Sequence, residues 1–178
     1  MSNRIVIIGA GGHAKVLCDA ILSQNEYVIN GFVDVTLPVG TTVINNYQVI
    51  AHEDNISDLR SQVDFFIVGV GNNIVRKKIF NSIKGILKPA TIIHSSAVIG
   101  SDVLIGEGTV ILANAVINAS SRIGENAIIN ARSVVDHDCI IGDEVHLSIG
   151  TMVGSHSIIN NGYLSKIGES INAFSKLG

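Results

Sequence analysis

The sequence predicts an α/β domain with a parallel sheet, followed by a parallel β-helix. Apolar runs alternate with amphipathic stretches up to about residue 86, and aliphatic residues then recur every six positions from Ile93 onwards. Aromatic residues make up only 4% of the 178 residues, so the apolar content is mostly Ile, Val, Leu and Ala beside 18 Gly. This composition favours regular strands and tight turns. We expect two domains, residues 1–86 and 87–178.

The first half has the pattern of βαβ units. Buried strands are expected at residues 4–8, 27–33 and 64–68, and helices at residues 13–23, 54–60 and 74–84. Strands that alternate with helices indicate a parallel sheet, in which the loops after the strand ends bind ligands.

The second half follows a six-residue period. Its aliphatic positions are Ile93, Ile99, Ile105, Ile111, Ile117, Ile123, Ile129, Val135, Ile141, Leu147, Val153 and Ile159. Four residues after each of the first eleven, a small or β-branched residue recurs, from Ala97 to Ser157. Such a repeat predicts a parallel β-helix in which one aliphatic side chain per strand fills the axis. An antiparallel β-domain, the alternative, does not require a strict step of six.

Charge, hydrophobicity and cysteine content exclude several kinds of partner and compartment. The net charge is -3 without blocks of either sign, so we expect neither nucleic acid nor a membrane surface as partner. The N-terminus lacks the pattern of a signal peptide, and no apolar run is long enough to span a bilayer. Cys18 and Cys139 match no metal or disulfide spacing, which fits a reducing compartment. A cytoplasmic protein is expected.

Five motifs occur together in this chain. They are Gly9-Ala10-Gly11-Gly12-His13, Phe32-Val33-Asp34, Gly71-Asn72-Asn73, Arg76-Lys77-Lys78-Ile79 and Val135-Asp136-His137-Asp138. Together they resemble the hexapeptide-repeat acetyltransferases that modify nucleotide-linked amino sugars in the bacillosamine pathway, or sialic acid. The resemblance extends from residue 4 to about residue 159. It implies a Rossmann-like half domain, then a left-handed parallel β-helix with 18 residues per coil and four coils over residues 93–164.

The same resemblance implies the chemistry and the partners. The substrates would be acetyl-CoA and a nucleotide-activated sugar, the assembly a homotrimer, and no metal is expected. The function implied is acetyl transfer to the amino group of a nucleotide-linked amino sugar. O-acetylation of a sugar such as sialic acid, or an inactive truncated binding protein, are the alternatives.

The nucleotide-sugar site is expected in the first half. The pattern Gly9-x-Gly11-x-x-Ala14 follows a strand and opens a helix, so its backbone N–H groups can hold a diphosphate. About 85 residues are too few for a full dinucleotide domain, which favours a single nucleotide. By resemblance, the substrate-binding residues are Gly11, Gly12, His13, Asp34, Gly71 and Asn72. A plain helix-start role for His13, and a solvated helix face for residues 76–78, stay open.

The catalytic residues are expected in the second half. His137 occupies the third position of its hexapeptide and therefore projects outward, and it matches the family's general base. A neutral imidazole can accept the proton of an attacking amine or hydroxyl. Asp138 matches the carboxylate that raises the pKa of this base. By resemblance, acetyl-CoA is bound by His146, Gly154 and Ser155.

Two pairings of Asp138 are compatible with the sequence. Neighbouring side chains in a strand point to opposite faces, so Asp138 reaches His137 only if the backbone turns there. Residues 18 apart stack one strand spacing away, which places His156 over Asp138 and Ser155 over His137. A zinc site formed by His137, His146 and His156 is a weaker alternative. Cys139 falls on a small position and is expected to pack in the core.

The six-residue pattern breaks near the C-terminus. Ser165 and Tyr163 occupy the aliphatic and small positions, and the domain is therefore expected to be shorter than in the family. Ile167, Ile171, Phe174 and Leu177 follow at intervals of four, three and three, which predicts a short amphipathic helix that caps the β-helix.

Overall fold

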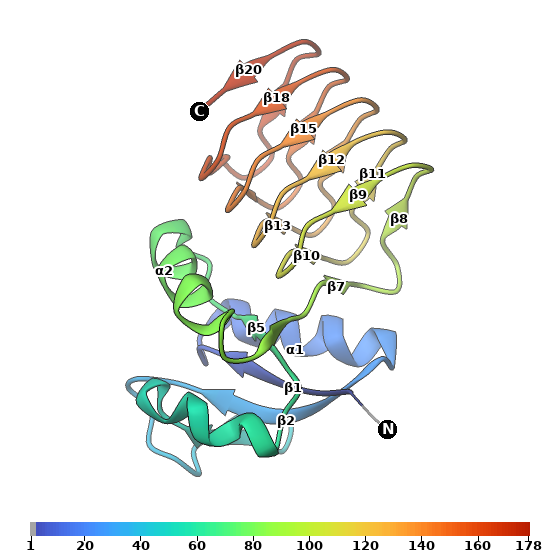
Figure 1. Ribbon diagram of the computed structural model, residues 1–178. Helices are drawn as coiled ribbons and strands as arrows, with labels where there is room; N and C mark the ends of the chain where they lie inside the picture. The colour runs from blue at the N-terminus through green and yellow to red at the C-terminus, as the bar shows by residue number, and fades with distance from the viewer. Residues whose placement is uncertain (1–2) are drawn as a thin grey trace. The chain divides into compact units, whose positions relative to one another are not determined.

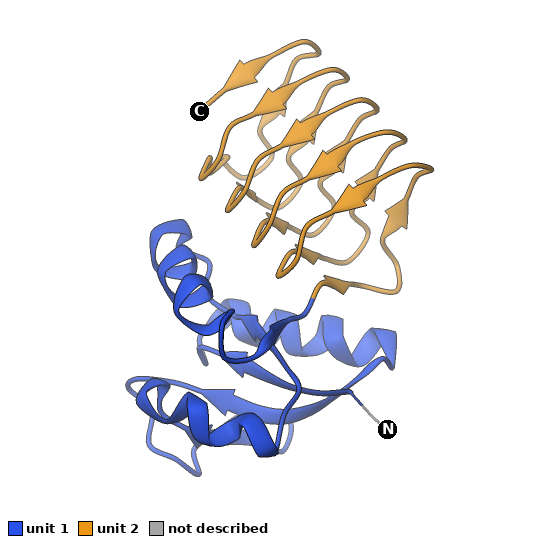
Figure 2. Ribbon diagram, viewed as in Figure 1, with its two compact units in different colours: residues 1–90 blue, residues 91–178 orange. Residues whose placement is uncertain are grey.

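The computed structural model describes residues 3–178. The chain divides into two compact units, residues 1–90 and 91–178, as Figure 2 shows by colour. Each unit has a hydrophobic core of its own. The first unit ends at Ala90, whereas the predicted boundary was residue 86.

The first unit is built on a six-stranded sheet with the order β3-β4-β2-β1-β5-β6. All neighbouring strands are parallel except β3 and β4, which form an antiparallel pair. The strands are β1 (Asn3–Ile8), β2 (Tyr27–Val33), β3 (Thr42–Ile44), β4 (Tyr47–Ala51), β5 (Phe65–Val68) and β6 (Lys88–Pro89). The three predicted strands are confirmed, whereas β3, β4 and β6 were not predicted.

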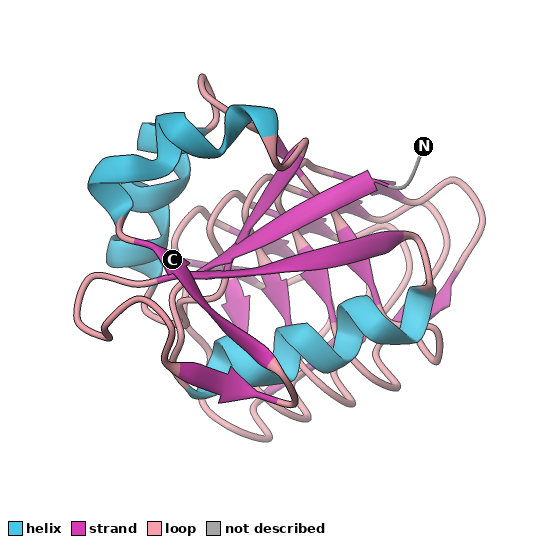
Figure 3. Cartoon of the chain, turned by 90° about the horizontal axis from the view of Figure 1, so that it is seen from below, coloured by secondary structure: helices cyan, strands magenta, loops and turns pink. Residues whose placement is uncertain are grey.

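Three helices cover the two faces of this sheet. They are α1 (Gly12–Gln24), the 3-10 helix η1 (Glu53–Ser61) and α2 (Asn73–Ile83), at the three predicted places. Alternate residues of β1 point to opposite faces. Val6 and Ile8 pack with η1 and α2 in one cluster, whereas Ile7 lies against the first turn of α1. Figure 3 shows the strands between α1 and the other two helices.

The second unit is a three-sided parallel β-helix made of two-residue strands (Figure 1). Each strand pairs in parallel with the strand 18 residues further on, as Ile111 does with Ile129. The first face contains β7 (Ile92–Ile93), β10 (Val110–Ile111), β13 (Ile128–Ile129) and β16 (His146–Leu147). The second face contains β8 (Val98–Ile99), β11 (Val116–Ile117), β14 (Val134–Val135), β17 (Met152–Val153) and β19 (Ser170–Ile171). The third face contains β9 (Leu104–Ile105), β12 (Arg122–Ile123), β15 (Ile140–Ile141), β18 (Ile158–Ile159) and β20 (Lys176–Leu177).

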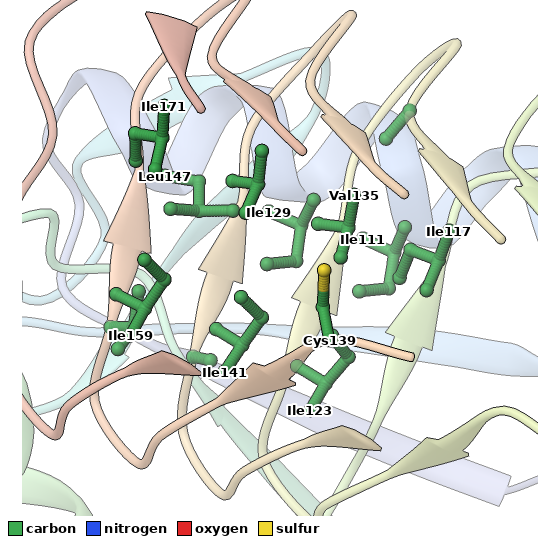
Figure 4. Packing of buried hydrophobic residues seen from close by; sticks show 14 residues of the cluster. Ile111, Ile117, Ile123, Ile129, Val135, Cys139, Ile141, Leu147, Ile159 and Ile171 are labelled. Atoms are coloured by element: carbon green, nitrogen blue, oxygen red, sulfur yellow. The ribbon is translucent and has the colours of Figure 1, made fainter. Parts of the chain in front are cut away.

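The second residue of each strand points to the axis of the coil. Figure 4 shows these aliphatic side chains in layers, with Cys139 packed among them as predicted. Ile111, Ile129 and Leu147 are fully buried. Full burial of one such side chain contributes roughly 1.5–3 kcal/mol, so each layer of the axis stabilises the coil to which it belongs.

The turn between the second and third faces has the same backbone conformation in every coil. At one position of this turn φ lies between 57° and 62°, and the residues there are Asp102, Ser120, Asp138, His156 and Phe174. A positive φ is uncommon for residues other than glycine. Because the turn repeats every 18 residues, these five residues form one column along an edge of the β-helix.

The predicted C-terminal helix is wrong. The segment continues the β-helix as β19 and β20, and Ile171 and Leu177 resume the six-residue step on the axis. Ile167 and Phe174, which the predicted helix would have buried, are 77% and 76% exposed. The helical spacing was a coincidence, since two of its four apolar residues also fit the period of six.

Ser165 explains why the repeat was not followed through this coil. It is buried at an axis position, and its hydroxyl accepts a hydrogen bond of 2.7 Å from the Ser148 N–H. The same hydroxyl lies 2.7 Å from that of Thr151. The buried hydroxyl of Ser165 therefore has hydrogen-bond partners, although the repeat normally has an aliphatic residue at this position.

Candidate active site

His137 and Asp138 form a hydrogen-bonded pair on the turn that joins the second face to the third. Nδ1 of His137 lies 2.7 Å from Oδ2 of Asp138. The left-handed backbone of Asp138, with φ of 57°, supplies the turn that adjacent residues need in order to meet. This hydrogen bond is the first cause that raises the pKa of His137 above its ordinary value. The ring can therefore act as a base whose second nitrogen, Nε2, is not the one held by Asp138.

His156 lies one coil further along, over Asp138, as the 18-residue spacing predicted. Its Nε2 is 4.0 Å from the same oxygen of Asp138, and the backbone N–H of His156 donates to the carbonyl of His137 at 3.2 Å. The Phe174 ring stacks on the His156 ring with centroids 4.9 Å apart. Asp138 is thus closer to His137, while His156 stands as a second imidazole beside it.

Asp136 holds the other side of His137. Its Oδ1 accepts hydrogen bonds from the backbone N–H of His137 at 2.8 Å and from the Asn118 amide at 3.0 Å. These bonds, the Asn118 amide first, lower the pKa of Asp136. A groove of about 360 Å³ begins here and runs along the second face between Asp136, Met152 and Asn172. The groove gives a ligand room beside the candidate base.

His146 is far from this pair along the coil. It lies on the first face, where its Nε2 is 3.2 Å from the Asn130 amide. In a three-sided coil, the turn between the second and third faces is across the axis from the first face. One chain therefore does not bring His137 and His146 together, so the alternative zinc site of His137, His146 and His156 would need residues from more than one chain.

Gly154 and Ser155 lie next to the candidate base. Gly154 lines the groove on the second face, and Ser155 precedes His156 on the turn. A Cβ on Gly154 would lie 2.5 Å from the backbone nitrogen of Ala173 in the next coil. The same obstruction meets a Cβ at Gly100, Gly106, Gly124 and Gly142. A side chain at Gly154 would therefore force the next coil to shift, although the equivalent positions of two other coils hold Asn118 and Asp136.

The other predicted residues gather at the carboxyl ends of β1, β2 and β5 in the first unit. Gly11 caps α1 and Gly12 begins it, and a Cβ added to either would meet no heavy atom within 4 Å. His13 lies half-buried in the first turn of the same helix. The first N–H groups of a helix have no partner within it and attract anions. The start of α1 is therefore open to a phosphate-bearing ligand.

Asp34 ties two of these strand ends together. Its Oδ2 accepts from the Ala10 N–H at 2.9 Å, and its Oδ1 accepts from the Thr36 and Leu37 N–H groups at 2.9 and 3.0 Å. Partial burial alone would raise the pKa of Asp34, but these hydrogen bonds together lower it. Asp34 thus fixes the glycine loop against the loop that follows β2.

Gly71 and Asn72 form the loop before α2. Oδ1 of Asn72 caps the helix by accepting from the Val75 N–H at 3.0 Å. The Arg76 guanidinium donates to the Gly71 carbonyl at 3.1 Å, and Arg76 is 1% exposed. Arg76 is therefore not part of a solvated helix face, which corrects one alternative from the sequence. Through this hydrogen bond, the Arg76 side chain stabilises the loop of Gly71 and Asn72.

Sequence reasoning missed His52 and Glu53, which follow β4. Nδ1 of His52 is 2.8 Å from the backbone oxygen of Asp34. Burial first, then the negative charge of Asp34, raises the pKa of Glu53. The loops after strands were the expected ligand positions, but β4 itself had not been predicted. An apolar alternation over residues 47–51 was the available signal.

The first unit matches a known domain family. Residues 4–83 match the sequence model of the PglD N-terminal domain. The UDP-N-acetylbacillosamine N-acetyltransferase of Bacillus subtilis is 35% identical over 108 residues, which cover 58% of this chain and 49% of that protein. The matched region thus spans about half the length of this curated relative.

Solved structures match nearly the whole chain. Perosamine N-acetyltransferase from Caulobacter crescentus, in complex with CoA and GDP-perosamine, is 31% identical with a TM-score of 0.79 and covers 99% of this chain and 86% of its own. The acetyltransferase domain of PglB from Neisseria gonorrhoeae, in complex with acetyl coenzyme A, is 29% identical with a TM-score of 0.70, over 99% and 88% of the two chains. The predicted fold class, a Rossmann-like half domain followed by a left-handed parallel β-helix, is confirmed.

Within residues 3–178, none of the helices has the length and apolar character needed to cross a bilayer. The site geometry, the match of the first unit and the full-length structural similarity agree with one another. The chain belongs to the hexapeptide-repeat sugar acetyltransferases of the bacillosamine and perosamine N-acetyltransferase group.

Proposed function

We propose that this protein transfers the acetyl group of acetyl-CoA to the amino group of a nucleotide-linked amino sugar. The observation that carries the proposal is the hydrogen bond of 2.7 Å between His137 Nδ1 and Asp138 Oδ2. An ionised carboxylate accepts only, so Nδ1 of the neutral ring carries the proton and Nε2 keeps a lone pair. His137 is thereby held in the tautomer that a general base needs.

The reaction needs one proton acceptor and no covalent enzyme intermediate. The sugar amine attacks the thioester carbonyl carbon, a C–N bond forms, and the C–S bond to CoA breaks. Nε2 of His137 takes the proton that the amine loses and then delivers it to the departing sulfur. Asp138 stabilises the imidazolium that exists between these two transfers.

The nucleotide-sugar is assigned to the first unit. The open start of α1 at Gly11, Gly12 and His13 would hold the diphosphate by backbone N–H groups. Asp34 and the loop of Gly71 and Asn72 flank this helix start at neighbouring strand ends. In support, the Caulobacter relative is a complex with CoA and GDP-perosamine.

Acetyl-CoA is assigned to the β-helix, with His146, Gly154 and Ser155 as its ligands. His137 and His146 are on opposite sides of one coil, so a site that uses both must draw them from two copies of the chain. A closed homotrimer, with each acetyl-CoA groove between two subunits, meets this requirement.

The test is turnover of acetyl-CoA with UDP-, GDP- and dTDP-linked 4-amino sugars. We expect release of the CoA thiol, together with a product that carries one acetyl group on nitrogen. Hydroxylamine treatment separates the two chemistries, because an ester is cleaved and an amide is not. Thiol release with a hydroxylamine-labile product would favour O-acetylation. No turnover with any amino sugar would contradict the proposal.

A further inference from the structure

His137, Asp138 and His156 bring three metal-binding atoms together at one edge of the β-helix. These atoms, two imidazole nitrogens and a carboxylate oxygen, all lie within 4.8 Å of one another. The three side chains are 45–50% exposed, so an ion can reach them from solvent. We infer that this cluster binds a divalent transition-metal ion such as Zn²⁺, which competes with the use of His137 as a base.

The spacing of the ligand atoms is close to what a metal requires. With metal–ligand bonds of about 2.0–2.1 Å, neighbouring ligands of a tetrahedral ion are about 3.3 Å apart. Asp138 Oδ2 now lies 2.7 Å from His137 Nδ1 and 4.0 Å from His156 Nε2. The third separation, between the two imidazole nitrogens, is at most 4.8 Å, so rotations of the exposed side chains are needed to bring all three atoms to the tetrahedral spacing.

The backbone and a neighbouring ring hold two of the ligands in place. Asp138 and His156 occupy the same turn position in successive coils, with φ of 57° at both. Phe174 stacks on the His156 ring at an interplanar angle of 14°, which restricts its rotation. The site is thus built on the coil repeat, and a fourth ligand position stays open to water, as in metal sites with three protein ligands.

The ligand set selects the class of ion. Two imidazoles and one carboxylate suit Zn²⁺, Ni²⁺ or Cu²⁺, whereas Mg²⁺ and Ca²⁺ prefer oxygen ligands. Imidazole binds metal through an unprotonated nitrogen. If the metal takes Nδ1 of His137, the proton of the neutral ring must move to Nε2. The nitrogen that would accept the substrate proton is then already protonated, so the bound ion suppresses general base catalysis.

Metal binding is measured first, without any substrate. Tag-free protein is stripped with EDTA, dialysed and titrated with Co²⁺, whose visible absorption reports imidazole and carboxylate ligation. We expect one Co²⁺ per chain, displaced by Zn²⁺. His156→Asn should weaken binding by roughly tenfold or more, as loss of a ligand does, and asparagine tolerates the positive φ at this turn. Circular dichroism verifies that the variant is folded.

The matched control is His94→Asn, a half-buried histidine of the β-helix, whose Nδ1 accepts a hydrogen bond from the Ser96 N–H. It should bind Co²⁺ as the unaltered protein does. Equal Co²⁺ affinity in His156→Asn and the unaltered protein, or equal loss in both variants, would overturn the inference.

Inhibition is measured second and rests on the proposed function. Zn²⁺ should inhibit acetyl transfer by the EDTA-treated enzyme, and His156→Asn should shift the half-inhibitory concentration upwards by the factor found for binding. Inhibition that is identical in the two proteins would overturn the competition with His137. Co²⁺ binding that needs His156, in a protein without any acetyl transfer, would refute the proposed function and leave the metal site standing.

Discussion

The carboxylate of Asp138 reaches His137, its immediate neighbour in the chain, at 2.7 Å. In an extended strand these two side chains would point to opposite faces. The left-handed conformation of Asp138 turns the chain between the second and third faces and brings them together. The candidate base and its partner therefore depend on the turn between the second and third faces of the β-helix.

Asp138→Asn should move the pH dependence of acetyl transfer. Asp138 raises the pKa of His137, and the neutral ring is the active form, so kcat should rise with pH through a value above the ordinary one of about 6.5. Without the carboxylate, the rising limb should lie at lower pH and the maximal rate should fall, because the tautomer is no longer fixed. Profiles of kcat against pH check this, and equal midpoints in the two proteins would contradict it.

The same pair gives a pH dependence of stability with a definite sign. The pKa of His137 is higher in the folded state than in the unfolded state, so the pair stabilises the fold below the unfolded value. That contribution disappears as the pH rises through the folded value. Both side chains are exposed, so the effect on kcat is the more sensitive measurement.

His137→Asn should lower kcat by roughly a hundredfold or more, the usual loss when a general base is removed. Binding of the nucleotide-sugar should not change, because it is assigned to the first unit. His94→Asn serves as the control, since this half-buried histidine also belongs to the β-helix but lies outside the candidate site. Steady-state kinetics and calorimetric titration with the nucleotide-sugar separate the two effects. A weaker nucleotide-sugar affinity in His137→Asn would contradict the assignment of nucleotide-sugar binding to the first unit alone.

Gly12→Val should weaken nucleotide-sugar binding by about tenfold or more, since a tenfold loss needs only about 1.4 kcal/mol. A Cβ at this position has no heavy atom within 4 Å, so the fold has room for the side chain. The space it fills is where the diphosphate is expected. Gly85→Val is the matched control, because Gly85 is equally unobstructed but lies after α2. Equal affinities in the two variants would remove Gly12 from the binding site.

Ile171→Ala should reduce the free energy of unfolding by roughly 2–4 kcal/mol, as loss of a buried aliphatic side chain does. Ile171 is 6% exposed on the axis. Ile167→Ala should cost under about 0.5 kcal/mol, since exposed substitutions are nearly neutral. Denaturant unfolding of the two variants checks the difference. Similar losses would instead favour the capping helix, in which both residues share one buried stripe.

Asp34→Asn should destabilise the protein at neutral pH by roughly 1–3 kcal/mol, the cost of a buried donor that loses its acceptor, because an amide nitrogen cannot accept the hydrogen bond of the Ala10 N–H. The folded-state pKa of Asp34 is lowered, so its contribution is present above the unfolded value of about 3.9 and is lost as the pH falls through the folded one. The stability difference between the two proteins should therefore shrink in acid. Thermal melts from pH 7 downwards test this, and a difference independent of pH would contradict it.

The period of the second half was predictable because one aliphatic residue per strand is a strict geometric requirement. The family resemblance added that three such strands make an 18-residue coil, and this coil length predicted the position of His156 over Asp138. Spacing alone left open whether Asp138 meets His137, because neither residue type indicates a positive φ. The family resemblance implied this pair, and the turn at Asp138 forms it. The repeat seemed to end one coil too early, because Ser165 stands at an axis position where an aliphatic residue was expected. Hydrogen bonds to Ser148 and Thr151 stabilise it there.

In the first half, long strands and helices were visible as apolar runs and amphipathic stretches. The β3–β4 hairpin was not, because its strands are short and half-exposed. Because β4 was not predicted, His52 and Glu53 were not recognised as residues that follow a strand end. A solvated position for Arg76 stayed open in the sequence, because charge is a poor guide to burial when the guanidinium can bond to loop carbonyls.

The column of turn residues also makes the mobility of His156 depend on the coil that follows it. Each coil of a β-helix is stabilised chiefly by its neighbours, so one layer can open while the others stay folded. Phe174 lies in the coil after that of His156, and Asp138 lies in the coil before it. When the coil of Phe174 opens, His156 loses the ring that restricts it, while the layer of His137 and Asp138 is still intact. The freedom of His156 is thus set by local opening of the coil of Phe174, well before global unfolding.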